Sequence, residues 1–156
     1  MIRRFLRRRR ERAQSLVEFS LVLPIFLIMV FGIIDFGMGL RAYITVAQAS
    51  REGARYASVG NPAGTFTSGG AGQCNGSTST SAVGRVCSGM DGLQLSNLQS
   101  VAVTYPQGQF PGNSVRVQTQ YRYYYITPVK ALVNFISAGS MPAYLTITTT
   151  TDMRLE

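Results

Sequence analysis

The longest apolar stretch of the chain runs from Leu16 to Leu40, and no charged residue stands between Glu18 and Asp35. An α-helix rises about 1.5 Å per residue, so these two carboxylates lie roughly 25 Å apart, close to the thickness of a membrane's hydrocarbon core. A helix that is apolar on all sides needs lipid or a large apolar partner surface, and no other segment offers such a surface. The pattern therefore predicts a transmembrane helix over 14–40.

The helical pattern continues beyond this stretch, because 41–58 contains no proline and one internal glycine. We expect an extracytoplasmic helix extension over 41–60, ended by Gly60 and the following Pro62. Small residues recur at every fourth position, which places them in a row on one face. Such a row allows close approach of the soluble domain or of a sister subunit, although alanine and glycine also simply fill ordinary helices. The row consists of Thr45, Ala49, Gly53 and Ala57.

The C-terminal part, 98–156, alternates between apolar and polar positions as half-buried strands do. This pattern predicts strands over 101–105 and 115–123, a turn over 106–113 between them, and a last strand over 144–153. Thr127 and Pro128 resemble the cap and first turn of a helix that ends before Gly139. The predicted fold class is α+β, with a long N-terminal membrane helix and a small antiparallel β-rich domain that has one packed helix.

Residues 61–97 form a Gly/Ser/Thr-rich region, which we interpret as a loop or flexible insert. Cys74 and Cys87 are the two cysteines of the chain. Without histidine or further thiols a zinc site is not expected, so the pair is either a disulfide on the oxidising side of a membrane or two free thiols. Closing a loop of this size stabilises a fold by roughly 3 kcal/mol in the chain-entropy model.

The positive charge is concentrated at the N-terminus. Seven arginines and Glu11 give +6 before Ala13, which leaves +2 of the total net charge of +8 for the rest of the chain. Basic residues directly before an apolar helix hold that end in the cytoplasm, so 1–13 is predicted to be a basic cytoplasmic leader. A nucleic-acid-binding protein spreads its basic groups over a folded face, and we expect no nucleic-acid partner.

Two other targeting signals compete with this interpretation. A cleaved secretory signal has a similar basic and apolar pattern, but the small residues Ala47 and Ala49 that suit its cleavage lie far beyond the apolar run. A twin-arginine signal at Arg3 and Arg4 lacks the expected surrounding residues.

Catalysis finds little support in the composition. The chain has no histidine, its single lysine, Lys130, stands outside any phosphate-loop pattern, and no pair of carboxylates follows a recognisable motif. We therefore expect no enzyme activity, no cofactor and no metal.

The residues of the N-terminal helix resemble a known family. Gln14-Ser15-Leu16-Val17-Glu18-Phe19 followed by Ser20 to Pro24, then Gly32 to Gly37 and Ala49 to Ala57, is similar to the TadE-like pseudopilins of tight-adherence (Flp/Tad) pilus systems. The resemblance implies that a prepilin peptidase cuts between Ala13 and Gln14, although family leaders usually end in glycine. Glu18 and Phe19 then take the positions used for recognition and assembly, with Glu18 fifth in the mature chain.

The resemblance further implies a bacterial cytoplasmic membrane protein with its C-terminal domain outside. Its partners would be membrane lipid, the prepilin peptidase, other pilin or pseudopilin subunits and the Tad assembly machinery, and the protein would enter the pilus as a minor subunit or support its assembly. The alternative function is an uncleaved, single-pass surface binding protein.

The acids of the apolar helix need an explanation in either case, because a carboxylate within a membrane is costly. After cleavage, the new ammonium group of Gln14 in one subunit could pair with Glu18 of a neighbour. Alternatively, Glu18 reaches the lipid head groups or is protonated. Asp35, with Arg41 within about two turns, is either an interfacial charge or a functional group.

Overall fold

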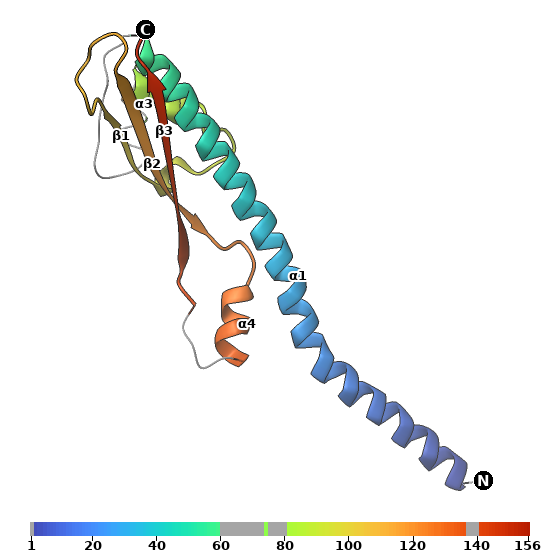
Figure 1. Ribbon diagram of the computed structural model, residues 1–156. Helices are drawn as coiled ribbons and strands as arrows, with labels where there is room; N and C mark the ends of the chain where they lie inside the picture. The colour runs from blue at the N-terminus through green and yellow to red at the C-terminus, as the bar shows by residue number, and fades with distance from the viewer. Residues whose placement is uncertain (1, 60–73, 75–80, 137–140) are drawn as a thin grey trace. The chain divides into compact units, whose positions relative to one another are not determined.

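The computed structural model describes the chain except for residues 1, 60–73, 75–80 and 137–140, and describes no side chains for 2–13 and 135–136 (Figure 1). A single helix, α1, takes up the first third of the chain, and three strands form the sheet. The elements are α1 (Ile2–Ser58), α3 (Ala82–Ser88), the 3-10 helix η1 (Leu95–Asn97), β1 (Leu98–Thr104), β2 (Ser114–Tyr124), α4 (Val129–Ile136) and β3 (Tyr144–Arg154).

The helix α1 is long because nothing in its sequence interrupts it before Ser58 except Pro24, which lies inside the helix. Proline is tolerated within membrane helices, where local adjustment satisfies the backbone group that it frees. The most apolar 18-residue window of Gln14–Ser58 has a mean hydropathy of 2.6, and none of that window is buried. In the described part of the chain, α1 is the one helix long and apolar enough to cross a membrane.

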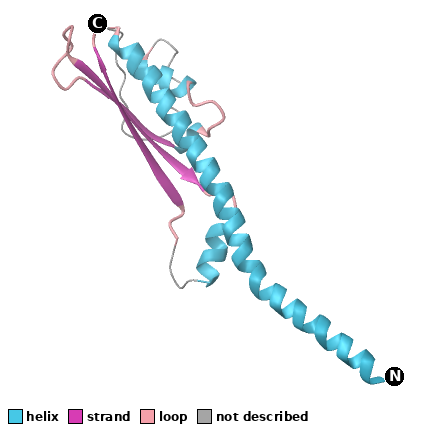
Figure 2. Ribbon diagram, turned by 45° about the vertical axis from the view of Figure 1, so that its right-hand side comes forward, coloured by secondary structure: helices cyan, strands magenta, loops and turns pink. Residues whose placement is uncertain are grey.

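The sheet is an antiparallel meander in the order β1-β2-β3 (Figure 2). Val101 of β1 faces Thr119 of β2, which in turn faces Thr149 of β3. The turn between β1 and β2 has positive φ angles at Gly108 (88°) and Gly112 (91°), a conformation that side chains with a Cβ rarely adopt.

The described residues divide into two compact units, 1–37 with 125–143, and 38–124 with 144–156. In the second unit, the C-terminal part of α1 packs against the sheet, and their shared core consists mostly of small aliphatic residues. Alanines and Val46 bury one face of the helix, while alternating residues of β1 and β2 bury the facing side of the sheet. The fully buried strand residues include Leu98, Val101, Val115, Val117 and Thr119.

The predicted α+β class, with a long apolar helix before a small antiparallel sheet, is confirmed. The strands lie where alternation placed them, with no end shifted by more than three residues, and α4 begins directly after Pro128. The helix α4 belongs to the compact unit that contains the first part of α1. The domain bounds drawn from the sequence, with a unit over 98–156, stay a prediction.

The structure differs from the sequence prediction at α3, which begins at Ala82 within the stretch interpreted as a loop. Its cap is local, because the side chain of Ser81 accepts a hydrogen bond from the amide of Gly84 at 3.0 Å. The predicted helix end at Gly60 and Pro62 lies outside the described residues.

Candidate functional site

The predicted processing site and the predicted assembly residues lie on one continuous helix. Ala13 is part of α1, although its side chain is outside the described set, and Gln14 is exposed. Glu18 is also exposed, and Phe19 beside it keeps 62% of its surface accessible. Within the described side chains, Glu18 has no ion-pair partner. The helix therefore presents a carboxylate within an exposed apolar surface.

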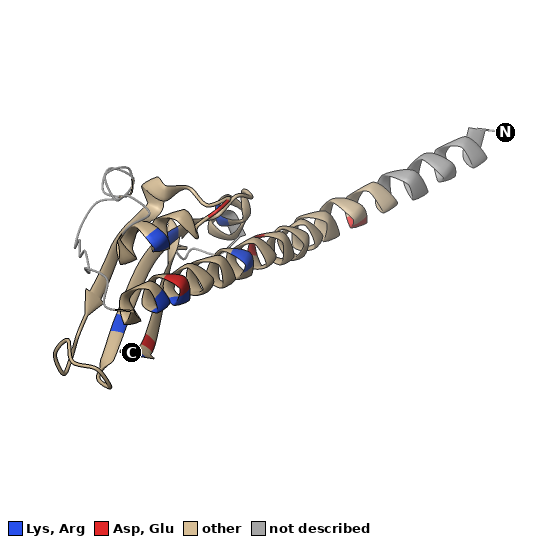
Figure 3. Cartoon of the chain, turned by 90° about the horizontal axis from the view of Figure 1, so that it is seen from above, with Lys and Arg blue, Asp and Glu red and all other residues tan. Residues whose placement is uncertain are grey.

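That apolar surface continues along α1 without a charge until Asp35 (Figure 3). Its large side chains point outward on several sides, as expected for a helix surrounded by lipid or by other apolar helices. The one hydroxyl in its first part, Ser20, donates to the carbonyl oxygen of Val17 at 2.8 Å and so needs no outside partner. Exposed members include Leu16, Leu21, Ile25, Met29 and Ile33.

Asp35 is buried, with 5% of its surface accessible, and the structure gives it specific partners. One carboxylate oxygen, Oδ1, accepts from the backbone amides of Ile126 at 2.9 Å and Thr127 at 3.3 Å. The other, Oδ2, accepts from the Thr127 hydroxyl. The same hydroxyl oxygen accepts from the Val129 amide at 3.4 Å. Asp35 thus fixes the N-terminal end of α4 to α1, a role that periodicity could not reveal because its partners lie about 90 residues away.

The row of small residues on α1 lies against α3. Ala49, Gly53 and Ala57 are buried, and Thr45 is half-buried. A Cβ on Gly53 would come within 2.3 Å of Val86 Cγ2 and 3.1 Å of the Ala82 carbonyl oxygen. One turn earlier, a Cβ on Gly89 would lie 3.0 Å from the Cα of Ala49. The two helices are closer here than larger side chains would allow, and the chain's own α3 occupies this part of the row.

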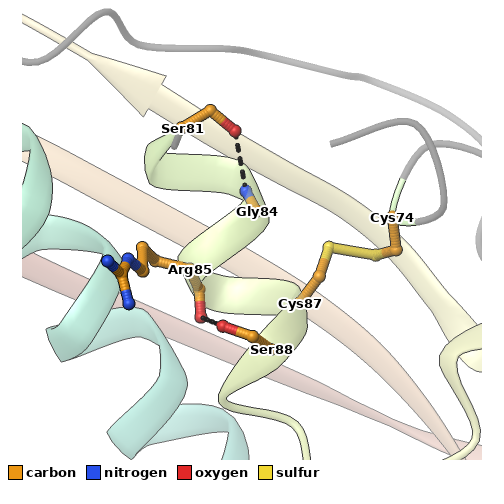
Figure 4. The surroundings of a disulfide bond; sticks show 6 residues. All are labelled: Cys74, Ser81, Gly84, Arg85, Cys87 and Ser88. Carbon is orange, nitrogen blue, oxygen red and sulfur yellow. Dashed lines mark hydrogen bonds between the residues drawn. A yellow bond between two sulfur atoms is a disulfide. The ribbon is translucent and has the colours of Figure 1, made fainter. Parts of the chain in front are cut away.

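Cys74 and Cys87 form a disulfide with a Cα–Cα distance of 5.6 Å (Figure 4). Cys87 lies on α3, so the bond ties this short helix to the preceding segment. At the other side of α3, the Arg85 guanidinium lies 5.2 Å from the centre of the Tyr56 ring of α1. The disulfide and the cation–π contact act together to hold α3 in place.

A cluster of three buried hydroxyls, which sequence reasoning missed, joins α1 to the middle of the sheet. Ser50 Oγ lies 2.8 Å from the carbonyl oxygen of Val46, 2.9 Å from Thr119 Oγ1 and 2.8 Å from Thr149 Oγ1. Because all three hydroxyls are buried, they must satisfy one another, and this fixes the rotation of α1 over the sheet.

The exposed apolar part of α1 is long enough to cross a membrane, and the C-terminal part of this helix packs against α3 and the sheet. Among the described residues, no group of three or more His, Cys, Asp or Glu side chains could hold a metal ion.

Comparison with known proteins identifies this helix. No curated protein and no solved structure gives a significant match to the chain. The family model described as TadE-like protein matches residues 13–55, which span the predicted processing site, the apolar stretch and most of the small-residue row. The resemblance inferred from the sequence is confirmed, and residues 13–55 are similar to the TadE-like family.

Proposed function

We propose that this protein is a pseudopilin that assembles with, or supports assembly of, a tight-adherence pilus. The observation that carries the proposal is the TadE-like helix, on which Glu18 stands in a continuous exposed apolar surface. A carboxylate in such a position is costly unless it finds a partner, and subunit association supplies one. The TadE-like family favours a pilus-associated protein held in a membrane by this helix.

In the proposed pathway of processing and assembly, the protein is first inserted into the membrane with its Arg-rich leader in the cytoplasm. A prepilin peptidase cleaves before Gln14 and leaves an ammonium group one helical turn from Glu18. Within one helix, residues 14 and 18 are i,i+4 neighbours, so the same two groups can also pair between adjacent subunits shifted along their axes. Pairing across subunits lowers the cost of both charges in lipid.

The disulfide supports an extracytoplasmic location of the second unit. Cys74–Cys87 needs an oxidising compartment to form and persist, and the cytoplasm keeps thiols reduced. A cytoplasmic leader and an oxidised domain at opposite ends of the apolar stretch require that α1 cross the membrane between them.

The first experiment measures the N-terminus of the membrane-bound protein in cells with and without a prepilin peptidase. We expect a chain that begins at Gln14 only when the peptidase is present. An intact Met1 in both strains would favour the alternative, an uncleaved surface protein. A start at Ser50 would indicate a secretory signal and would overturn both interpretations.

The second experiment separates assembly from insertion. Glu18→Ala should abolish or strongly reduce pilus production and co-purification with other pilins, while the amount of protein in the membrane fraction stays within about twofold. Glu52→Ala, which removes an exposed acid of the same helix outside the apolar stretch, is the matched control and should assemble normally. Normal pili from Glu18→Ala cells would disprove the pairing.

A further inference from the structure

The segment 125–143 leaves the sheet after β2 and returns to it before β3. It carries a single charged side chain, Lys130, whereas the shorter strand β2 carries both Arg116 and Arg122. This composition is unusual for a solvent-exposed connection between two strands, because surface segments carry more charge. The pilus function proposed above does not account for it.

Asp35 determines the position along α1 at which this segment contacts that helix. Its carboxylate holds the amides of Ile126 and Thr127, so the start of the segment lies beside the end of the apolar stretch. From there α4 runs back along α1 toward the N-terminal end of that helix, as Figures 1 and 2 both show. The burial pattern of α1 agrees: residues 14–22 are all exposed, but Leu27, Ile28 and Phe31 are half-buried.

Several polar backbone groups next to α4 are paired within the protein. The amides of Ile126 and Thr127 use Asp35, Pro128 has no N–H, and the Val129 amide has the Thr127 hydroxyl. After the helix, the amide of Met141 donates to Asn134 Oδ1 at 3.0 Å. In water these groups would need no such partners, but in hydrocarbon each unpaired one costs several kcal/mol.

We propose that α4 lies in the outer leaflet of the membrane beside α1, with lipid covering its exposed side. This inference rests on the proposed function, in which α1 spans the membrane and the sheet lies outside. The eight residues of α4 extend about 12 Å, roughly half of the 25 Å between Glu18 and Asp35. Lys130, in the first turn of α4, reaches the head groups with its flexible side chain.

Lipid is expected to cover the exposed side of α4 because the neighbouring surface of α1 faces lipid under the proposed function. At the depth of α4, Met29 and Ile33 keep about two thirds of their surface exposed, and under the proposed function that surface faces lipid. The exposed residues among the described side chains of α4, Ala131 and Asn134, add no charge to the surface, and Asn134 Oδ1 accepts from the Met141 amide. The two helices therefore present one lipid-facing surface.

The test uses the absence of tryptophan from this chain, because a single introduced Trp reports one position. The full-length protein carrying Ala131→Trp or Ile126→Trp is reconstituted in phosphatidylcholine vesicles that contain lipids brominated at a shallow or a deep acyl carbon. Met29→Trp is the control for α1, and Phe110→Trp, in the turn between β1 and β2, is the control for water. Far-UV circular dichroism checks that each variant is folded.

We expect bromolipids to quench Ala131→Trp about as strongly as Met29→Trp, with Ile126→Trp quenched best by the shallow bromine. Phe110→Trp should respond to aqueous iodide alone. If Met29→Trp is quenched by lipid and both Ala131→Trp and Ile126→Trp respond to iodide, α4 lies in water and this inference is wrong while the membrane anchor stands. Shielding of Ala131→Trp from both quenchers would also overturn it, by indicating a protein partner. Failure of Met29→Trp to respond to bromolipids would overturn the proposed anchor itself.

Discussion

Gly53 of α1 approaches Val86 of α3 so closely that a Cβ on residue 53 would stand 2.3 Å from Val86 Cγ2. That separation is far below van der Waals contact, so either the Val86 side chain or α3 as a whole must shift to accommodate any other residue. The glycine, the disulfide at Cys87 and the Arg85 contact to Tyr56 all act on the same short helix. The position of α3 is therefore determined by contacts rather than by the stability of an isolated seven-residue helix.

Gly53→Ala should destabilise the protein. Overpacking a tight contact costs about 1 to 3 kcal/mol, and the higher helix propensity of alanine returns up to about 1 kcal/mol. We expect a net loss on the order of 1 kcal/mol, measured by urea denaturation of the full-length protein in detergent.

Gly39→Ala is the matched control, because its Cβ would meet only the Tyr123 ring at 3.7 Å, an ordinary contact. That variant should be neutral or slightly more stable. Val86→Ala makes room for the new methyl group of Gly53→Ala. The loss of unfolding free energy caused by Val86→Ala should therefore be smaller in the Gly53→Ala background than in the wild type. Equal costs in both backgrounds would contradict the close contact.

Ser50→Ala should also lower the free energy of unfolding. The substitution leaves the buried hydroxyls of Thr119 and Thr149 without their third member, and an unsatisfied buried polar group costs about 1 to 3 kcal/mol. The same denaturation measurement applies.

The triple variant Ser50→Ala, Thr119→Val, Thr149→Val provides the contrast. Replacing all partners by apolar groups of similar shape is often nearly neutral, so this variant should recover much of the lost stability. If it is less stable than the wild type by the sum of three independent losses, the hydroxyls do not act as a cluster.

Much of this architecture was predictable because its signals are local. Alternation of apolar and polar residues predicted the three strands, and Thr127-Pro128 predicted the start of α4. The uncharged run and the absence of proline from 41–58 predicted α1 from residue 14 onward, but not its extension back to Ile2. The partners of Asp35 and Ser50 were not predictable, because a lone acid or serine in a helix has no periodicity that points to a distant residue. The short helix α3 was missed since seven residues within a Gly/Ser/Thr-rich region carry no helical repeat, and tertiary contacts stabilise it instead.

Acid should weaken the pairing of β2 with β3 through Asp152. Arg116 donates to Asp152 through Nε at 2.8 Å and Nη2 at 3.0 Å, and this hydrogen bonding lowers the pKa of the Asp152 carboxyl below its ordinary value of 3.8. A lowered folded-state pKa means that the pair contributes stability above pH 3.8, and that this contribution is lost as the pH falls through the folded-state pKa.

An exposed ion pair contributes little to the free energy of unfolding, so its pH dependence is best measured by comparing the wild type with variants that lack one partner. Asp152→Asn should be less stable than the wild type at pH 7, with the gap closing on acidification below about pH 4. In an Arg116→Gln background the same substitution should show a much weaker pH dependence. A gap that is independent of pH in both backgrounds would refute the assignment.

Asp35→Ala should release the start of α4 from α1. The carboxylate accepts the amide protons of Ile126 and Thr127, and hydrogen bonds to charged groups contribute about 1.5 to 3 kcal/mol, so hydrogen exchange at these two amides should accelerate about 10- to 100-fold in detergent micelles. Thr127→Val removes only the hydroxyl donor and the cap of Val129, and it should leave the Ile126 amide protected. Asp35→Asn keeps an acceptor oxygen without the charge and should fall between the two. Unchanged exchange at Ile126 in Asp35→Ala would mean that contacts other than the Asp35 hydrogen bonds hold the start of α4 against α1.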